Sequence, residues 1–337
     1  MTAGHLSPAA APHAPSHRPH RPSLPLRVGT RASPLALVQT RAFLANLRHF
    51  CPVLRSMEVF EEHAIRTTGD VVQDRKLAEI GGKGLFAKEI HEALLDRRVD
   101  FAVHSLKDLE TELPPGIVLA CTLPREDARD ALILPPGSAA PEARAPFARL
   151  PRGAMIGTSS VRRQAQLLHA RPDLRVGLLR GNVQTRLGKL AEGQFDATLL
   201  AAAGLRRLGL DHAASLLIDP DIMVPAACQG IVGVTVRESD TALRDMLGGI
   251  EDARARAVAT AERAMLAVLD GSCRTPIGGY AQLDADGTLH LTGLVARADG
   301  SFLLRRQIRG PATEALLIGA ELGAALRADS PADIFDD

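Results

Sequence analysis

Cys273 lies in a run rich in glycine, serine and proline, Gly271-Ser272-Cys273-Arg274-Thr275-Pro276-Ile277-Gly278-Gly279. This composition disfavours a helix or a central strand, so we expect the thiol on an exposed or mobile loop. A free cysteine most often serves as inert packing in a core, and that interpretation stands while the loop is considered alone. A thiol on such a loop has little to pack against, which makes a chemical role the competing interpretation.

Arginines recur where predicted strands give way to helices. They are Arg31, between a strand and the N-cap Ser33; Arg162 and Arg163, in the first turn of a helix capped by Ser159 or Ser160; Arg180, at the end of a strand; and Arg186, one helical turn after Asn182. The amides and dipole of a helix N-terminus already favour an anion, so an added guanidinium makes a carboxylate or phosphate site. Only five of the 40 Lys and Arg residues are lysines, and genome base composition could explain that abundance of arginine, but not its placement.

Asp108 ends the segment His104-Ser105-Leu106-Lys107-Asp108, which closes another predicted strand at the same edge. It could simply be a salt-bridge partner for Lys107. The alternative is a carboxylate that faces cationic groups of a ligand while the arginines hold its anionic groups. Together these residues indicate a ligand with several negative charges and a cationic or N–H-rich centre.

The elements that would position these side chains alternate between strand and helix from Leu26 onward. Strands are expected at 26–30, 100–104, 154–157, 175–179 and 195–200, with helices at about 34–49 and 84–97 and after each of the last three strands. This alternation predicts parallel sheets in open α/β domains, whose ligands gather beyond the carboxyl ends of the strands. A stretch rich in Pro, Ala and Gly, 135–153, is expected to be a loop inside the second unit.

The pattern changes after about Glu251. An Ala-rich helix reaches about Leu269, the cysteine loop follows, and segments with period-two alternation are broken by turns at 284–287 and 298–300 before a last helix from about Thr313. This predicts a separate α+β domain with an antiparallel sheet. Residues 1–25 hold six prolines, four histidines and no acid, and are expected to be a disordered tail rather than a secretory signal, with metal binding by the histidines as an alternative.

The composition excludes several classes of function. With 337 residues, 46% hydrophobic and 23% charged, the chain is typical of a soluble globular protein of two or three domains. A net charge of +1, no Trp and one Tyr argue against a nucleic-acid or anionic-membrane surface. The four cysteines share no close spacing, so neither a metal site nor a disulfide framework is indicated and a reducing cytosol is expected.

Six motifs follow one another in the chain: GTRASPLA at 29–36, GGKGLF at 81–86, HSLKD at 104–108, GTSSVRRQ at 157–164, LRGNVQTRL at 179–187 and GSC at 271–273. In order and spacing they resemble the motifs of the porphobilinogen deaminase (hydroxymethylbilane synthase) family, from about Leu26 to the C-terminus. The resemblance implies two periplasmic-binding-protein-like α/β domains around a cleft plus a C-terminal α+β domain. Domain 1 would span 26–124 with 231–248, domain 2 would span 129–224, and domain 3, which carries the cysteine, would span 253–337.

The resemblance also implies a reaction. Four porphobilinogen molecules would be joined head to tail with release of ammonia, and the linear tetrapyrrole would then be hydrolysed free. The primer would be a dipyrromethane cofactor attached by a thioether to Cys273, for which a thiolate is a suitable carbon nucleophile. The protein would work as a cytoplasmic monomer, without nucleic acid, membrane or metal.

By the same resemblance Asp108 would be catalytic, accepting hydrogen bonds from pyrrole N–H groups and stabilising positive charge. Cofactor-binding residues would be Cys273, Lys107, Ser105, Arg31, Ser33, Thr158, Ser159, Ser160, Arg162, Arg163, Arg180, Gly181, Asn182 and Arg186. Substrate-binding residues would be Arg31, Ser33, Arg180, Arg186, Arg207, Phe86 and Gln229. Each pyrrole carries an acetate and a propionate, which accounts for the arginines.

Three positions depart from the family pattern. Cys228 stands where glycine is usual, Leu109-Glu110 replaces a common Val-Pro, and Arg274-Thr275 follows the cysteine where Gln-Val is frequent. None of these changes removes a group that the reaction needs. The alternative class, a periplasmic anion-binding protein, would need a secretory signal and would have no use for a third domain with Gly-Ser-Cys.

Overall fold

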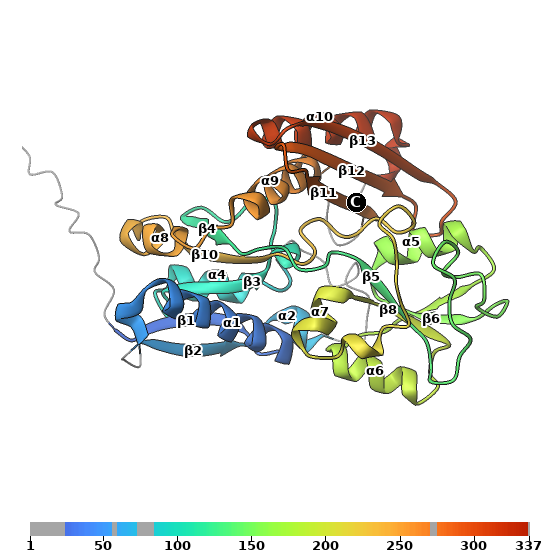
Figure 1. The fold of residues 1–337 in the computed structure, drawn as a ribbon, viewed down its shortest axis with the longest axis horizontal. Coiled ribbons are helices and arrows are strands. Elements are labelled where there is room, and N and C mark those ends of the chain that lie inside the picture. Colours follow the sequence, from blue (N-terminus) through green and yellow to red (C-terminus); the bar gives the residue numbers. More distant parts are fainter. Residues whose placement is uncertain (1–23, 56–58, 73–83, 270–274, 336–337) are drawn as a thin grey trace, which may run out of the picture.

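The computed structural model describes residues 24–55, 59–72, 84–269 and 275–335 (Figure 1). Most of the tail expected at 1–25 therefore lies outside the described residues, as do Cys273 and its neighbours 270–274. Three sheets organise the rest of the chain. No helix in the described ranges combines the length and apolar character needed to cross a bilayer.

The first sheet has the strand order β2-β1-β3-β10-β4. Its strands are β1 (Leu26–Arg31), β2 (Phe60–Ile65), β3 (Phe101–Ser105), β4 (Ile117–Thr122) and β10 (Val232–Arg237). Its helices are α1 (Pro34–Phe50), α2 (Thr68–Val71), α4 (Lys88–Leu95) and α8 (Thr241–Gly248), and a 3₁₀ turn, η2 (Leu106–Asp108), follows β3. Only β10 runs antiparallel to its neighbours.

The second sheet repeats this plan with the order β7-β6-β8-β5-β9. Its strands are β5 (Asp130–Ile133), β6 (Met155–Gly157), β7 (Arg175–Gly177), β8 (Ala197–Ala201) and β9 (Leu216–Leu217), with helices α5 (Val161–Ala170), α6 (Val183–Ala191) and α7 (Ala202–Arg207). Here β5 is the reversed strand. The two units lie side by side, with the first at the left and the second at the right of Figure 1.

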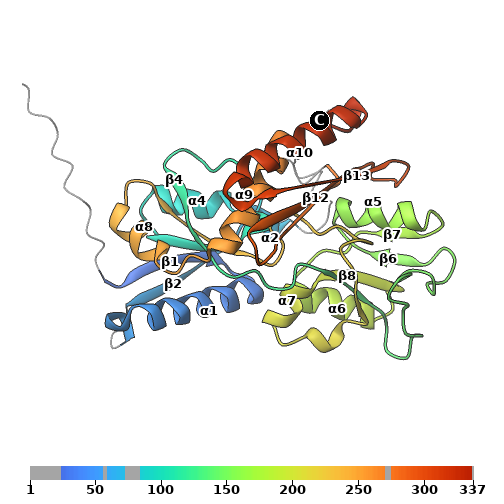
Figure 2. The same ribbon diagram turned by 45° about the horizontal axis from the view of Figure 1, so that its top comes forward.

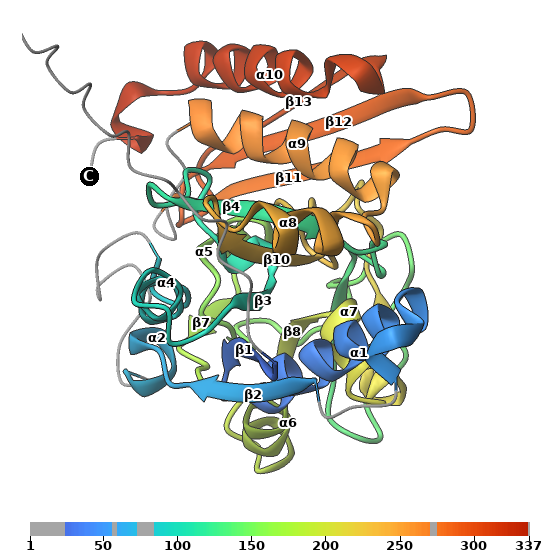
Figure 3. The ribbon, with the colours of Figure 1, turned by 90° about the vertical axis from the view of Figure 1, so that its left-hand side faces the viewer.

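The third unit consists of α9 (Ala253–Val268), the antiparallel strands β11 (Ile277–Leu283), β12 (Thr288–Ala296) and β13 (Leu303–Pro311), and α10 (Ala315–Asp329). Both helices cover one face of the sheet (Figures 2 and 3). They approach closely at Gly319, where an added Cβ would lie 2.2 Å from the carbonyl oxygen of Ala261. Met265, Leu291 and Leu322 belong to the apolar core between helices and sheet.

The expected fold class is confirmed, with one refinement of the topology. Alternating strands and helices predicted purely parallel sheets, yet each α/β unit has one reversed strand. The reason is that the chain passes between the units twice, through 123–129 and 218–231, and each crossing leads into a strand that enters its sheet from the opposite direction, β5 and β10 respectively.

A buried carboxylate ties both crossings to the third unit. Glu262 on α9 is fully buried and accepts hydrogen bonds at 2.6 Å from Arg125 Nη1, at 2.6 Å from the Ala281 amide and at 2.5 Å from the Cys228 amide. Because an unpaired charge in this position would be strongly destabilising, these donors fix the crossings relative to α9.

The N-termini of three helices are capped as the sequence predicts. Ser33 caps α1 and accepts a hydrogen bond from the Ala36 amide, with Pro34 at the first helical position, while Ser160 and Asn182 cap α5 and α6. Because these caps sit at strand-to-helix junctions, they bring α1, α5 and α6 to the edges of the sheets that face each other.

Candidate functional site

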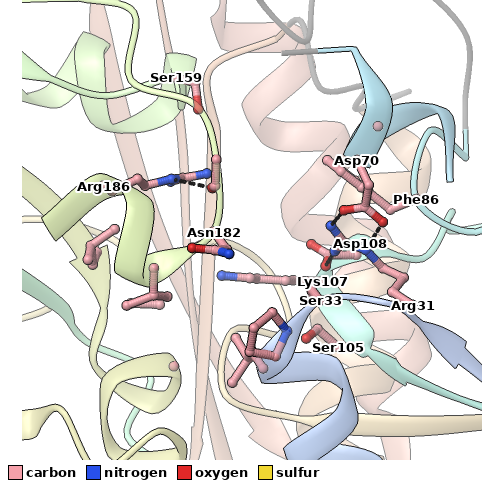
Figure 4. A pocket seen from close by; sticks show the side chains of 18 of the residues that line it. Arg31, Ser33, Asp70, Phe86, Ser105, Lys107, Asp108, Ser159, Asn182 and Arg186 are labelled. Atoms are coloured by element: carbon pink, nitrogen blue, oxygen red, sulfur yellow. Dashed lines mark hydrogen bonds and ion pairs between the residues drawn. The ribbon is translucent and has the colours of Figure 1, made fainter. Parts of the chain in front are cut away.

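A cavity of about 680 Å³ lies between the first and second units. Residues at the carboxyl ends of strands in both sheets line it, as expected for open α/β units. From the sequence prediction these include Arg31, Ser33, Phe86, Ser105, Lys107, Asp108, Ser159, Ser160, Arg162, Arg163, Arg180, Gly181, Asn182, Arg186, Arg207 and Gln229. Figure 4 shows Arg31, Asp70 and Asp108 on one wall and Ser159, Asn182 and Arg186 on the other, with Lys107 extending between them.

Arg31, at the end of β1, bridges two carboxylates. Its Nε lies 3.2 Å from Oδ2 of Asp70 while Nη2 contacts Oδ1 of the same residue, and Nη1 lies 3.0 Å from Oδ2 of Asp108 (Figure 4). The Phe86 ring centroid is 4.2 Å from the guanidinium carbon. Burial alone would raise the pKa of Asp70, but hydrogen bonds and charge from Arg31 outweigh it and hold that pKa below its ordinary value.

Asp108 is the last residue of η2, directly after β3. Its side chain is 24% exposed and faces the cavity, so a ligand can reach the carboxylate. Its ion pair is with Arg31, and the simpler expectation of a pair with the adjacent Lys107 is not what the structure shows. An accessible carboxylate fixed by a guanidinium on one side can accept N–H donors or stabilise a cation on the other.

Lys107 reaches across toward the crossing segment. Its Nζ donates to Oε1 of Gln229 at 3.2 Å, and Nε2 of Gln229 donates to the Ala128 carbonyl at 2.7 Å and to Asp130 at 3.0 Å, which fixes the amide orientation. The Lys107 side chain is exposed to solvent, but its ammonium extends between the two walls of the cavity, where nearby protein atoms reduce its hydration. This desolvation lowers the pKa of Lys107 to about 8; Asp108 opposes the shift and Arg163 adds to it.

Arg162 and Arg163, in the first turn of α5, face a carboxylate of the protein itself. Asp130 is fully buried and lies 2.7 Å from Nη1 of Arg162 and 2.7 Å from Nη2 of Arg163. A cation in the first turn of a helix is electrostatically unfavourable unless an anion lies nearby, and Asp130 is that anion within the protein. One aspartate leaves the pair with a net positive charge next to the cavity.

Three further arginines are held by main-chain carbonyls. Nη2 of Arg180 donates across the cavity to Gly69 at 2.9 Å and Val72 at 2.8 Å, Nε of Arg186 donates to Gly181 at 2.9 Å, and Nη2 of Arg207 donates to Gly230 at 2.6 Å. The carbonyls orient all three guanidinium groups, and those of Arg186 and Arg207 keep their charge because a carbonyl does not neutralise it. Burial lowers the pKa of Arg186 to about 10, and Arg163 and Arg180 add to that shift.

Two predicted residues are not in the cavity lining. Thr158 is buried, and its Oγ1 accepts a hydrogen bond from the Ser160 amide at 3.2 Å, so it shapes the turn before α5. Cys273 lies outside the described residues, between the end of α9 and β11, and its role stays a prediction.

Sequence reasoning missed Asp70, Asp130, Gln39 and Arg66, all of which contribute to the site. Gln39 accepts a hydrogen bond from Ser105 at 3.1 Å, and Arg66 lines the cavity after β2. The segment Thr67-Thr68-Gly69-Asp70 follows a strand, as the predicted site residues do, and this position could have indicated a role for Asp70. Asp130 opens an apolar strand, where a charge is unusual enough to indicate a buried partner.

Comparison with known proteins gives a consistent result. Residues 26–245 match the family model "Porphobilinogen deaminase, dipyromethane cofactor binding domain", and residues 257–328 match "Porphobilinogen deaminase, C-terminal domain". The chain is 48% identical to porphobilinogen deaminase of Sorangium cellulosum, covering 90% of this chain and 98% of that protein. It is 47% identical to the Paracoccus denitrificans enzyme, covering 94% and 97%, and 44% identical to the chloroplastic enzyme of rice, covering 92% and 86%.

Among solved structures, a BvgS VFT2 domain of Bordetella pertussis aligns with a TM-score of 0.39 and 13% identity, covering 67% of this chain and 84% of that one. The substrate-binding protein of an amino acid ABC transporter aligns with a TM-score of 0.37 and 15% identity, covering 67% and 90%.

Proposed function

Because the chain belongs to the porphobilinogen deaminase family, we propose roles for its own residues in that family's reaction. The protein is a transferase of tetrapyrrole biosynthesis with hydroxymethylbilane synthase activity. It condenses four porphobilinogen molecules head to tail with release of ammonia at each step, and then releases the linear tetrapyrrole by hydrolysis. The observation that carries the residue assignment is an accessible carboxylate, Asp108, in a cavity lined with cations from both α/β units.

The family implies a dipyrromethane cofactor, and the cavity residues fit such a group. Its four ring carboxylates need cations that are not already neutralised, and Arg186 and Arg207 make no ion pair within the described chain. Its pyrrole N–H groups need an acceptor, which Asp108 provides. When bound, the cofactor supplies the primer to which substrate pyrroles are joined. Among the described residues, no group of three His, Cys, Asp or Glu is placed to hold a metal ion.

Asp108 would act on charge that develops during the reaction. When ammonia leaves, positive charge develops on the part of the substrate to which it was bound. A carboxylate next to that charge stabilises the transition state more than the ground state. A charge-assisted hydrogen bond is worth roughly 1.5–3 kcal/mol even without such development. Arg31 would hold the Asp108 carboxylate in its orientation toward the cavity, since Nη1 of Arg31 lies 3.0 Å from Oδ2 of Asp108.

The arginines would hold the ring carboxylates. Arg180 and Arg186 present guanidinium groups from the second unit, and Lys107 presents an ammonium from the first. A guanidinium binds a carboxylate through two parallel N–H donors, which fixes the ring plane as well as its position. Arg162 and Arg163 would contribute the net charge that remains beside Asp130, and Ser33, Ser105, Ser159 and Ser160 would add hydroxyl donors.

Cys273 would carry the cofactor by a thioether. The three cysteines of the described chain, Cys51, Cys121 and Cys228, are free, and burial raises the pKa of both Cys121 and Cys228 to about 12, which leaves them without thiolate at neutral pH. We further propose the domain boundaries given by the sequence and action as a cytoplasmic monomer. Light scattering coupled to size exclusion tests the oligomeric state.

The residue assignment is tested by converting porphobilinogen with purified wild type, Asp108→Asn and Cys273→Ser. The proposal expects hydroxymethylbilane from the wild type alone at a normal rate. Reversible binding of porphobilinogen by the wild type, without ammonia release, would indicate a pure binding protein instead.

A further inference from the structure

The cations that line the cavity differ in whether the protein already supplies a partner. Arg31 pairs with Asp70 and Asp108, Arg162 and Arg163 pair with Asp130, Lys107 donates to Gln229, and Arg180, Arg186 and Arg207 donate to main-chain carbonyls. Arg66 is the exception. Within the chain that the structure describes, it makes no hydrogen bond or ion pair, although it lines the same cavity.

Arg66 belongs to the row of residues at the carboxyl ends of the parallel strands. β1 and β2 pair so that Arg31 is opposite Ile65, and Arg66 follows Ile65 directly. The amide of Ala32 donates to the Ile65 carbonyl at 3.1 Å, which continues the pairing of the two strands beyond their ends. The backbone of Arg66 therefore lies close to that of Arg31, directly after the edge strand β2.

The backbone around Arg66 is well fixed, so its lack of a partner does not reflect a loose loop. Thr67 is fully buried and donates from Oγ1 to Oδ2 of Asp70 at 2.8 Å. The amide of Gly69 donates to the Leu85 carbonyl at 2.8 Å, and an added Cβ at Gly69 would lie 2.3 Å from the Phe86 ring. Asp70, the next carboxylate along the chain, already pairs with Arg31.

We propose that Arg66 binds ring carboxylates of the pyrroles added during elongation. The proposal rests on the proposed function, since it assigns one more residue to the same site. Each condensation brings two further carboxylates into the cavity, an acetate and a propionate. The other cations are oriented by internal partners before any substrate arrives, whereas Arg66 is exposed and its N–H donors make no hydrogen bond within the described chain. It is therefore suited to a carboxylate that is absent at first and arrives as the chain grows.

The experiment compares Arg66→Gln and Arg66→Lys with Arg41→Gln. Arg41 is a matched control because it is an arginine of the same unit whose side chain is 62% exposed and pairs with Glu62 at 3.2 Å, away from the cavity. Each purified protein is weighed intact after denaturation, then mixed with one to four equivalents of porphobilinogen and weighed again, and its KM and kcat are measured. Thermal unfolding checks that each variant is folded. A substitution of an exposed arginine should shift the midpoint temperature Tm by no more than about 2 °C.

The proposal expects all variants to purify with the same covalent cofactor mass as the wild type. Arg66→Gln should then accumulate early adducts, with KM for porphobilinogen raised about tenfold, the size expected for one charge-assisted contact that water partly screens. Arg66→Lys should recover most of the difference, and Arg41→Gln should match the wild type.

Two results would overturn the proposal while leaving the proposed function intact. One is an adduct distribution and KM in Arg66→Gln equal to those of Arg41→Gln. The other is a variant that lacks the cofactor mass, which would assign Arg66 to the primer. Failure of the proposed function looks different, because the wild type itself would then carry no cofactor mass and form no adducts.

Discussion

Asp108 pairs with Arg31, 77 residues earlier in the chain, with Nη1 and Oδ2 separated by 3.0 Å. The pair connects the ends of two neighbouring parallel strands, β1 and β3, on the wall of the cavity that the first unit forms. Since Asp70 holds the other side of the same guanidinium, the orientation of Asp108 depends on a carboxylate that does not touch it.

Asp108→Asn should separate chemistry from cofactor attachment. The amide keeps the size and one acceptor but loses the negative charge, so turnover should fall by at least about a hundredfold, as when a preorganised electrostatic group is removed. The covalent cofactor mass should remain. Steady-state rates and intact mass measured on one preparation test both points, and near-normal turnover would reduce Asp108 to a structural partner of Arg31.

Asp70→Asn should act through Arg31. We expect a lower kcat with little change in cofactor mass, together with a loss of stability of about 1–3 kcal/mol from the broken charge-assisted pair. Arg31 holds the pKa of Asp70 below its ordinary value of 3.8, so the ionised form stabilises the folded state above that pH, and this contribution is lost as pH falls through the folded pKa.

Urea unfolding at several pH values measures this contribution. The difference in unfolding free energy between wild type and Asp70→Asn should be constant near neutrality, from about pH 6 to 8. It should become smaller only below about pH 4. A difference that instead varies near neutrality would contradict the assignment to Asp70.

The charge of Lys107 should be visible in the pH dependence of substrate binding. Its pKa of about 8 means that the ammonium is present below that pH and is lost above it, well before an ordinary lysine titrates. KM for porphobilinogen should therefore rise in the wild type as pH passes through about 8. Lys107→Gln should have a higher KM at pH 7 and should lack that rise, and a rise of the same size in the variant would assign the titration to another group.

Cys228 should prove to be a structural residue with a strained backbone. Its φ is +60°, a conformation that favours glycine, and it is 2% exposed. Cys228→Gly should be more stable than Cys228→Ala by about 1 kcal/mol, because alanine keeps the left-handed strain while glycine does not. Urea unfolding of the two variants measures the difference, and both should retain the cofactor. An alanine variant at least as stable as the glycine variant would show that the backbone there relaxes.

Local chemistry allowed much of this structure to be predicted. The N-caps Ser33, Ser160 and Asn182 and the strand periodicity depend on neighbours within a few residues, so the order of elements and the arginine positions followed from the sequence. The reversed strands did not, because a strand's direction depends on where the chain crosses between units.

The carboxylates that pair with the arginines of the site could not be predicted from the sequence either. Asp130 meets Arg162 across 32 residues, and Asp70 meets Arg31 across 39. Spacing along the chain identifies cations that need an anion, but three-dimensional packing decides whether a ligand or the protein supplies it. Arg162 and Arg163 show this, since their first anion is internal.

The most direct test of the account is the intact mass of the denatured protein, followed by peptide mapping, for wild type and Cys273→Ser. The account predicts that the wild type retains the mass of two linked pyrroles on the peptide that contains Cys273, and that Cys273→Ser purifies without this mass and without activity. A fully active wild type with no added mass, or an adduct mapped to Cys51, Cys121 or Cys228, would contradict it.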